Sequence, residues 1–228
     1  MPTDDLLAVI GRADELYRGR ARPGAVRESV MILSGARGSN ERYEVQWRLA
    51  RALFFLGQEA AEPAGKSQLH AAGVGAGERA VALNPERVEG HFWVGINLAL
   101  FAESHSSLRA LRALSWARSE LRMAAKMNEA YHDAGPLRVL GRLAHKAPRL
   151  LGGSLRKSEK YYNRALEIAP ANTVTLRYAA ELAMARKQAP RAERLLERLL
   201  SLPDDPDWEY ESRRDRELAR ELLKRMGI

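Results

Sequence analysis

Arg138, Arg142 and Lys146 recur at every fourth position of one predicted helix, so their side chains share a face. His145 lies beside this basic stripe. A guanidinium group can hold a carboxylate or a phosphate through two parallel hydrogen bonds, which a lysine ammonium cannot do. The chemistry that these residues predict is therefore the binding of an acidic ligand.

The positive charge of the chain is concentrated around this stripe. The 228 residues have a net charge of +8, and residues 105–164 hold 13 lysines and arginines against four acidic residues. The remainder is nearly balanced, with 24 basic and 25 acidic residues. A local excess of this kind favours an anionic partner. The alternative is a solvated face whose charges pair with Glu129 or Glu181. No nucleic-acid partner is expected, because no nucleic-acid-binding motif appears.

The stretch Lys157–Pro170 indicates the architecture that positions the stripe. Ser158, Tyr162, Ala165 and Pro170 follow a small, large, small, proline spacing. Small residues let a neighbouring helix approach, the ring fills the remaining gap, and proline stops the helix. This pattern is typical of the second helix of a tetratricopeptide (TPR) repeat, and it predicts that Tyr162 is buried.

Helical periodicity dominates the whole chain, and strand alternation is almost absent. Stacked repeats bury their apolar faces only against neighbours, so a repeat array forms one continuous domain. We therefore expect an all-α fold, a TPR-like α-α superhelix (a right-handed solenoid) of about five helix pairs plus a C-terminal capping helix. The expected single domain spans residues 1–228, with an N-terminal helix pair at 1–39, four repeat-like pairs with insertions at 40–202, and the capping helix at 203–228.

Two glycine-rich connections interrupt this pattern. The link Glu59–Gly75 is about ten residues too long for a bare repeat, which predicts a mobile loop or a frayed helix. Its glycines run on to Gly77, but no strand precedes them and no Gly-Lys-Ser/Thr follows, so a flexible linker is expected rather than a phosphate loop. At Gly152–Gly153 we expect a turn whose small residues let a loop pass close to the helices.

The repeat register extends the basic stripe into a groove. In TPR solenoids the first helix of each pair lines the concave surface, and its fifth and ninth residues face the groove. Aromatic residues of an earlier pair and charged residues of the last pair join the stripe in this register. The candidate ligand-binding residues are Phe92, Trp93, Ile96, Arg138, Arg142, His145, Arg177 and Glu181.

Catalysis and metal binding are not expected. The chain has no cysteine and shows no nucleophile, base and orienting residue in a recognisable set. No two histidines stand four positions apart, and a zinc site needs three or four converging ligands. The histidines are His70, His91, His105, His132 and His145. We therefore expect a protein that is not an enzyme and that has no cofactor and no metal.

Targeting signals are also missing from the sequence. No apolar run approaches the roughly 20 residues of a transmembrane helix. Residues 1–20 contain several acidic side chains, which a signal peptide would not have. The expected location is the cytoplasm as the sequence stands, or the periplasm or envelope if a signal segment has been removed.

From about Ala80 to Arg225 the pattern is more specific than a generic repeat. It is made of Gly90-His-Phe-Trp-Val-Gly-Ile-Asn97, Ala134-Gly-Pro-Leu-Arg-Val-Leu-Gly141, Tyr161-Tyr-Asn-Arg-Ala-Leu-Glu-Ile-Ala-Pro170 and Pro203-Asp-Asp-Pro-Asp-Trp208. This resembles the TRAP transporter T-components, a bacterial family of TPR proteins, and more remotely the regulator-of-microtubule-dynamics TPR family. The resemblance implies a helical solenoid without enzymatic activity that binds partners or small acidic ligands. T-components can oligomerise around a pore, which makes a homo-oligomer an option.

Two hypotheses follow for the function. The first is a TPR binding module, associated with a TRAP transporter, that recognises an acidic ligand, a protein or a peptide. The second is a scaffold that assembles with itself or with a protein partner. A closed pocket among Phe92, Trp93, Arg138 and Arg142 would favour the first hypothesis, and an open groove the second.

Overall fold

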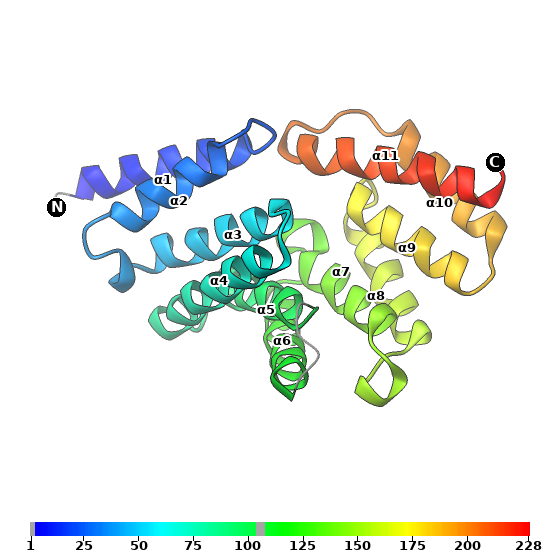
Figure 1. Cartoon of the computed structure of the whole chain (residues 1–228), viewed down its shortest axis with the longest axis horizontal. Helices are drawn as coiled ribbons and strands as arrows, with labels where there is room; N and C mark the ends of the chain where they lie inside the picture. The colour runs from blue at the N-terminus through cyan, green and yellow to red at the C-terminus, as the bar shows by residue number, and fades with distance from the viewer. Residues whose placement is uncertain (1–2, 104–107) are drawn as a thin grey trace. The chain divides into compact units, whose positions relative to one another are not determined.

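A computed structural model of the chain describes residues 3–103 and 108–228. Within these ranges the structure has eleven α-helices and three short 3-10 helices, and it has no strand (Figure 1). The chain falls into two compact units, Met1–Asn128 and Glu129–Ile228. Each unit is described by itself below, and the assignment of residues 1–228 to one domain stays a prediction.

The first unit is built from consecutive helices that pack against one another (Figure 1). Its largest fully buried side chains include Trp93, Phe92 and Leu121, so aromatic rings of α5 form much of its core. The short 3-10 helix Ser39–Glu41 precedes the third α-helix. The α-helices of this unit are α1 (Thr3–Arg18), α2 (Ala25–Gly35), α3 (Tyr43–Glu59), α4 (Pro63–Leu83), α5 (Val88–Glu103) and α6 (Leu108–Met127).

The expectation of a loose segment at Glu59–Gly75 is wrong. Helix α4 runs without interruption from Pro63 to Leu83, and only residues 60–62 of that link lie outside a helix. Its glycines let α5 approach, because a Cβ added to Gly73 would lie 2.4 Å from Asn97 Oδ1. A Cβ on Gly77 would lie 2.7 Å from the Cβ of Val94. The extra residues therefore lengthen a packed helix rather than loosen a loop.

Asn97 joins the three helices that meet at this crossing. Its side chain is fully buried, and Nδ2 donates to the carbonyl oxygens of Ala50 on α3 (3.0 Å) and Trp93 on α5 (2.8 Å). Its Oδ1 lies 3.3 Å from Nδ1 of His70 on α4. Burial lowers the pKa of His70, so its ring is neutral at pH 7 and its Nδ1 can donate to Asn97.

The second unit contains five α-helices and two short 3-10 helices. Its core joins α9, α10 and α11 through apolar side chains that are fully buried, namely Leu176, Ala180, Leu196, Leu199 and Ala219. The 3-10 helices are Arg149–Leu151 and Pro206–Trp208. The α-helices are α7 (Tyr131–Lys146), α8 (Leu155–Ile168), α9 (Thr173–Ala185), α10 (Ala189–Ser201) and α11 (Glu209–Met226).

The predicted burial of Tyr162 is confirmed. Its side chain is 1% exposed, and its ring lies over Gly141 of α7, where an added Cβ would come within 2.5 Å of the ring. The neighbouring Ser158 is also fully buried and donates its hydroxyl to the carbonyl of Gly141 at 2.8 Å. The small, large, small spacing of α8 therefore sets the contact between α7 and α8.

The turn expected at Gly152–Gly153 is confirmed. Gly152 has φ of 82°, and a Cβ on Gly153 would lie 1.8 Å from the carbonyl oxygen of Ala147. Ser154 then donates its backbone N–H to Ala144 of α7 at 2.7 Å, and its hydroxyl caps the first turn of α8. Only a residue without a side chain fits where the loop passes the end of α7.

Candidate functional site

Three of the predicted ligand-binding residues meet where α7 faces α9. Arg142 Nη1 donates to Glu181 Oε2 at 2.5 Å, and Arg177 Nη1 donates to Glu181 Oε1 at 2.6 Å. Both guanidinium groups also lie over the ring of Tyr178, at 4.2 Å and 4.6 Å from its centroid. Ion pairing and stacking on one ring hold the two arginines in fixed orientations.

Helix α11 extends this arrangement with residues that the sequence analysis did not select. Asp215 is fully buried and accepts from Arg177 Nε at 2.8 Å and from Thr173 Oγ1 at 3.1 Å. Arg214 Nη2 reaches the same carboxylate at 3.1 Å. Asp215 stands in the charged run Arg213–Arg216, where no periodicity marks one residue as buried, so sequence alone had little means to find it.

The resulting surface, which we call the basic face, comprises Arg142, Lys146, Arg177, Tyr178, Glu181, Arg214 and Asp215. Its four basic side chains surround two carboxylates, which leaves an excess of two positive charges. Burial alone would raise the pKa of Glu181, but Arg142, Arg177 and Lys146 outweigh it and hold this pKa below its usual value. Burial opposes the charge of Arg177 as well, and Asp215 and Glu181 still raise the pKa of this arginine. Glu181 and Arg177 are therefore both charged at neutral pH.

Arg138 lies one turn before Arg142 but has a different environment. It is 5% exposed, and its Nη1 donates to the carbonyl of Asp133 at 2.8 Å and its Nη2 to that of His132 at 3.3 Å. Its guanidinium group lies 5.4 Å from the centroid of the Trp208 ring. His132, Asp133 and Ala134 all have positive φ, a conformation that costs non-glycine residues free energy. Arg138 thus stabilises the entry to α7, and its role in ligand binding stays a prediction.

His145 lies next to the basic face on α7. Its Nδ1 is buried and has no hydrogen-bond partner among the described residues. Burial, together with the positive charges of Lys146 and Arg142, lowers the pKa of His145. The ring is therefore neutral at pH 7 and adds no charge to the basic face.

The predicted aromatic residues belong to the first unit. Phe92 and Trp93 are both 0% exposed, and their ring centroids lie 4.8 Å apart with a T-shaped geometry. Ile96 is half-buried on the same helix, α5. Phe92 and Trp93 thus form part of the core of that unit. Their participation in one ligand site with the arginines of the second unit stays a prediction.

The described residues contain neither a cluster of metal-ligating side chains nor a membrane-spanning helix. Among residues 3–103 and 108–228, no group of three or more histidine, aspartate or glutamate side chains is placed to hold a metal ion. His105 lies outside these ranges. No helix in the described part of the chain is both long and apolar enough to cross a membrane.

Comparison with solved structures confirms the fold class. A thermophilic TPR protein of Thermus thermophilus superimposes with a TM-score of 0.67, covering 90% of this chain and 98% of its own. The two sequences are 19% identical, so this likeness shows an all-α, TPR-like helical repeat fold and nothing further about function. No curated protein sequence matches the chain.

Comparison with protein families gives a match over more than half of the chain. The sequence profile of regulator of microtubule dynamics protein 1-3 matches residues 9–150, which run from α1 to the 3-10 helix that follows α7. This is the more remote of the two resemblances expected from the sequence. The chain therefore belongs to the regulator of microtubule dynamics protein 1-3 family.

Proposed function

We propose that this protein is a non-enzymatic interaction module whose basic face binds an acidic segment of a partner protein. The observation that supports this proposal most directly is the excess of arginine and lysine over carboxylate on the surface formed by α7, α9 and α11. An acidic segment complements that excess.

The basic side chains divide into an accessible group and a buried group. The side chains of Arg142, Lys146 and Arg214 are 24%, 52% and 33% exposed, so they can contact a partner. Arg177 and Asp215 are 9% and 0% exposed and lie beneath them. The buried pair orders the accessible groups before any partner arrives, which reduces the entropy lost on binding.

Glu181 acts as an internal competitor for the acidic partner. Its two carboxylate oxygens already accept hydrogen bonds from Arg142 and Arg177. A partner carboxylate adds to this arrangement through the donors that remain on Arg142 and through Lys146, whose Nζ lies 3.7 Å from Glu181. Binding through such partly exposed charges is weak and sensitive to salt.

The fold and the family support an interaction module rather than an enzyme. TPR-like helical repeats present extended surfaces to partners. The resemblance of residues 80–225 to TRAP transporter T-components suggests a small carboxylate as another acidic ligand. Binding at the basic face does not depend on that resemblance.

The test is calorimetric titration of an eight-residue peptide of alternating aspartate and alanine with a free C-terminal carboxylate. Wild type is expected to bind it, and more weakly as salt rises. Arg142→Gln/Lys146→Gln should lower the affinity about tenfold, because two exposed ion pairs of about 0.7 kcal/mol each amount to about 1.4 kcal/mol. Glu181→Gln should strengthen binding, since it releases both guanidinium groups from their internal carboxylate.

The matched control is Arg156→Gln/Lys160→Gln on α8. Both residues are exposed, lie outside the basic face, and change the net charge by the same amount. This variant should bind the peptide as tightly as wild type does. A peptide with asparagine in place of aspartate should bind neither wild type nor this variant. Equal affinity in wild type and in Arg142→Gln/Lys146→Gln would remove the basic face as the binding site.

A further inference from the structure

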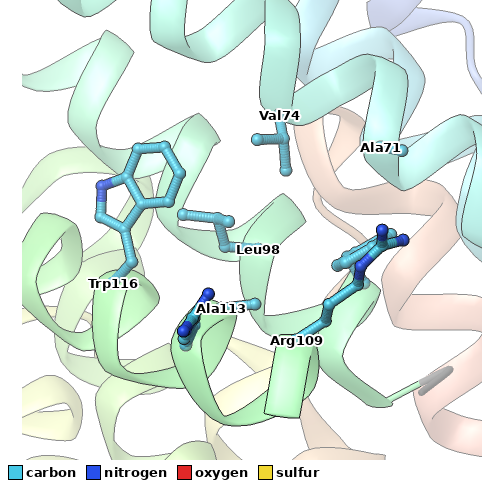
Figure 2. Close-up of a pocket in the computed structure, with 8 residues that line it drawn as sticks. Ala71, Val74, Leu98, Arg109, Ala113 and Trp116 are labelled. Carbon is cyan, nitrogen blue, oxygen red and sulfur yellow. The ribbon is translucent and has the colours of Figure 1, made fainter. Parts of the chain in front are cut away.

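The first unit contains a hollow of about 390 Å³ that the basic face does not involve. It opens among α4, α5 and α6, with Val74 projecting into it from α4 and with Arg109 and Trp116 on opposite sides (Figure 2). Its volume lies within the range of pockets that hold small molecules. The lining residues are Ala71, Val74, Leu98, Phe101, Arg109, Arg112, Ala113 and Trp116.

The hollow lies beside two helices, α4 and α6, that are longer than the helices of the last repeat. Helices α4 and α6 have 21 and 20 residues, whereas α9 and α10 each have 13. The lining residues of α4 and α6 lie in the first two-thirds of each long helix. Ala71 and Ala113 have small side chains on facing walls, so the extended helices leave space between them. Six of the eight lining residues, two on α4 and four on α6, therefore come from the first unit's two long helices.

The chemistry of the lining is apolar with two positive charges. Leu98, Phe101 and Val74 supply apolar surface, and none of the lining residues is acidic. Arg109 and Arg112 are exposed and have no hydrogen bond or ion pair in the part of the chain that the structure describes. Unlike the arginines of the basic face, these two have no internal carboxylate to displace.

Trp116 gives the hollow a partly exposed aromatic wall. It is 41% exposed, which is unusual for so large an apolar side chain, and its indole N–H already donates to Glu120 at 2.9 Å. The Oε2 atom of Glu120 lies 2.6 Å from Nδ1 of His91, so its negative charge is already paired. The ring of Trp116 is thus left to contact an apolar group, and Glu120 does not cancel the charge of the two arginines.

We propose that this hollow binds a free small amphiphile, a molecule with an apolar body and a single anionic group. The body packs against Leu98, Phe101 and Trp116, and the anionic group pairs with Arg109 and Arg112. The argument is charge complementarity, because two unpaired guanidinium groups adjoin an apolar pocket with no acidic residue in its lining. This site lies in the first unit and stands independently of the basic face.

The probe is 1-anilinonaphthalene-8-sulfonate, whose fluorescence increases in apolar surroundings, compared with N-phenyl-1-naphthylamine, which has the same rings without the sulfonate. Native protein should bind the sulfonate at a single site and about tenfold or more tighter than the neutral compound, as expected for a charge-assisted contact. Arg109→Gln/Arg112→Gln should reduce the affinity for the sulfonate to that for the neutral compound. Arg122→Gln/Lys126→Gln removes two exposed charges of α6 outside the hollow and should change neither affinity.

A second variant tests the cavity itself. Val74→Phe fills the hollow and should abolish binding of both compounds, while circular dichroism shows that the helices remain. If Val74→Phe unfolds, Ala71→Phe at an exposed position of the same wall replaces it and should have the same effect. Equal binding of the charged and neutral compounds to wild type would overturn the role of the arginines. Unchanged binding of the compounds in the folded phenylalanine variant would overturn the site. Wild type that binds an acidic peptide in the hollow but neither compound would also overturn it.

Discussion

At the scale of single residues, His91 and Glu120 form a partly buried pair whose charge state follows from geometry. His91 is 7% exposed, with Nδ1 2.6 Å from Glu120 Oε2 and Nε2 2.9 Å from the carbonyl oxygen of Pro85. Both ring nitrogens face acceptors, so only the protonated imidazole satisfies both. The hydrogen bond with Glu120 raises the pKa of His91 against the opposing effect of burial. Burial would raise the pKa of Glu120, but the hydrogen bonds from His91 and Trp116 keep it below its usual value.

This pair predicts how stability depends on pH. The pKa of His91 is higher in the folded state than the value of about 6.5 in an unfolded chain, so its contribution is fully present below that pH. It is lost as the pH rises through the folded pKa. The free energy of unfolding, measured in urea, should therefore fall as the pH is raised from about 6 to about 9.

Variants of the glutamate check this prediction. Glu120→Gln removes the partner charge, so its stability should fall less over the same pH range. Glu217→Gln changes an exposed carboxylate of α11 and should leave the slope of wild type unchanged. If the free energy of unfolding falls equally with pH in wild type and in Glu120→Gln, the contact with Glu120 does not raise the pKa of His91.

At the scale of elements, the glycines of α4 have opposite roles two residues apart. The Cβ of an alanine at position 73 would overlap Oδ1 of Asn97, whose side chain is buried and held by hydrogen bonds to Ala50, Trp93 and His70. At Gly75 an added Cβ would meet only the end of the Arg79 side chain, at 3.6 Å. The same substitution therefore tests packing at one position and helix propensity at the other.

Gly73→Ala should destabilise the protein by about 1–3 kcal/mol, the usual range for overpacking. Gly75→Ala should stabilise it by about 0.5–1 kcal/mol, because alanine loses less conformational entropy than glycine in a helix. Chemical denaturation measures both changes. Effects of the same sign would show that α4 does not pack on α5 through this glycine.

At the scale of the whole molecule, the second unit contains its own apolar core. The buried clusters around Leu176 and Tyr162 draw all their members from within Glu129–Ile228. In solenoids, stability is approximately the sum of each repeat and its nearest neighbours, so part of an array can fold by itself. The fragment 129–228 should therefore be helical by circular dichroism and should melt in one cooperative transition.

A fragment that is unfolded at low temperature would contradict this and would favour a single cooperative domain over residues 1–228. The matched comparison is the same fragment with Leu196→Ala, which removes a fully buried side chain from the core. It should be less stable by about 2–5 kcal/mol, as large core deletions usually are.

The helices and the repeat type could be predicted from the sequence because their determinants are local. The spacing around Tyr162 acts within one or two turns of a single helix. The repeat register also placed Arg142, Arg177 and Glu181 together, because equivalent positions of successive repeats face the same side.

Only the tertiary structure decided which of these residues are accessible and which are packed. Arg138 and Arg142 are one helical turn apart and equivalent in pattern. Trp208 and carbonyl groups in the first turn of α7 cover Arg138, whereas Arg142, paired with Glu181, stays partly exposed. The glycines of α4 likewise predict a flexible linker from their sequence, but in the structure Asn97 of α5 packs directly against Gly73. Each of these outcomes depends on a side chain from another element that is distant in sequence. The pattern of residues within one helix does not specify which side chains of another helix will pack against it.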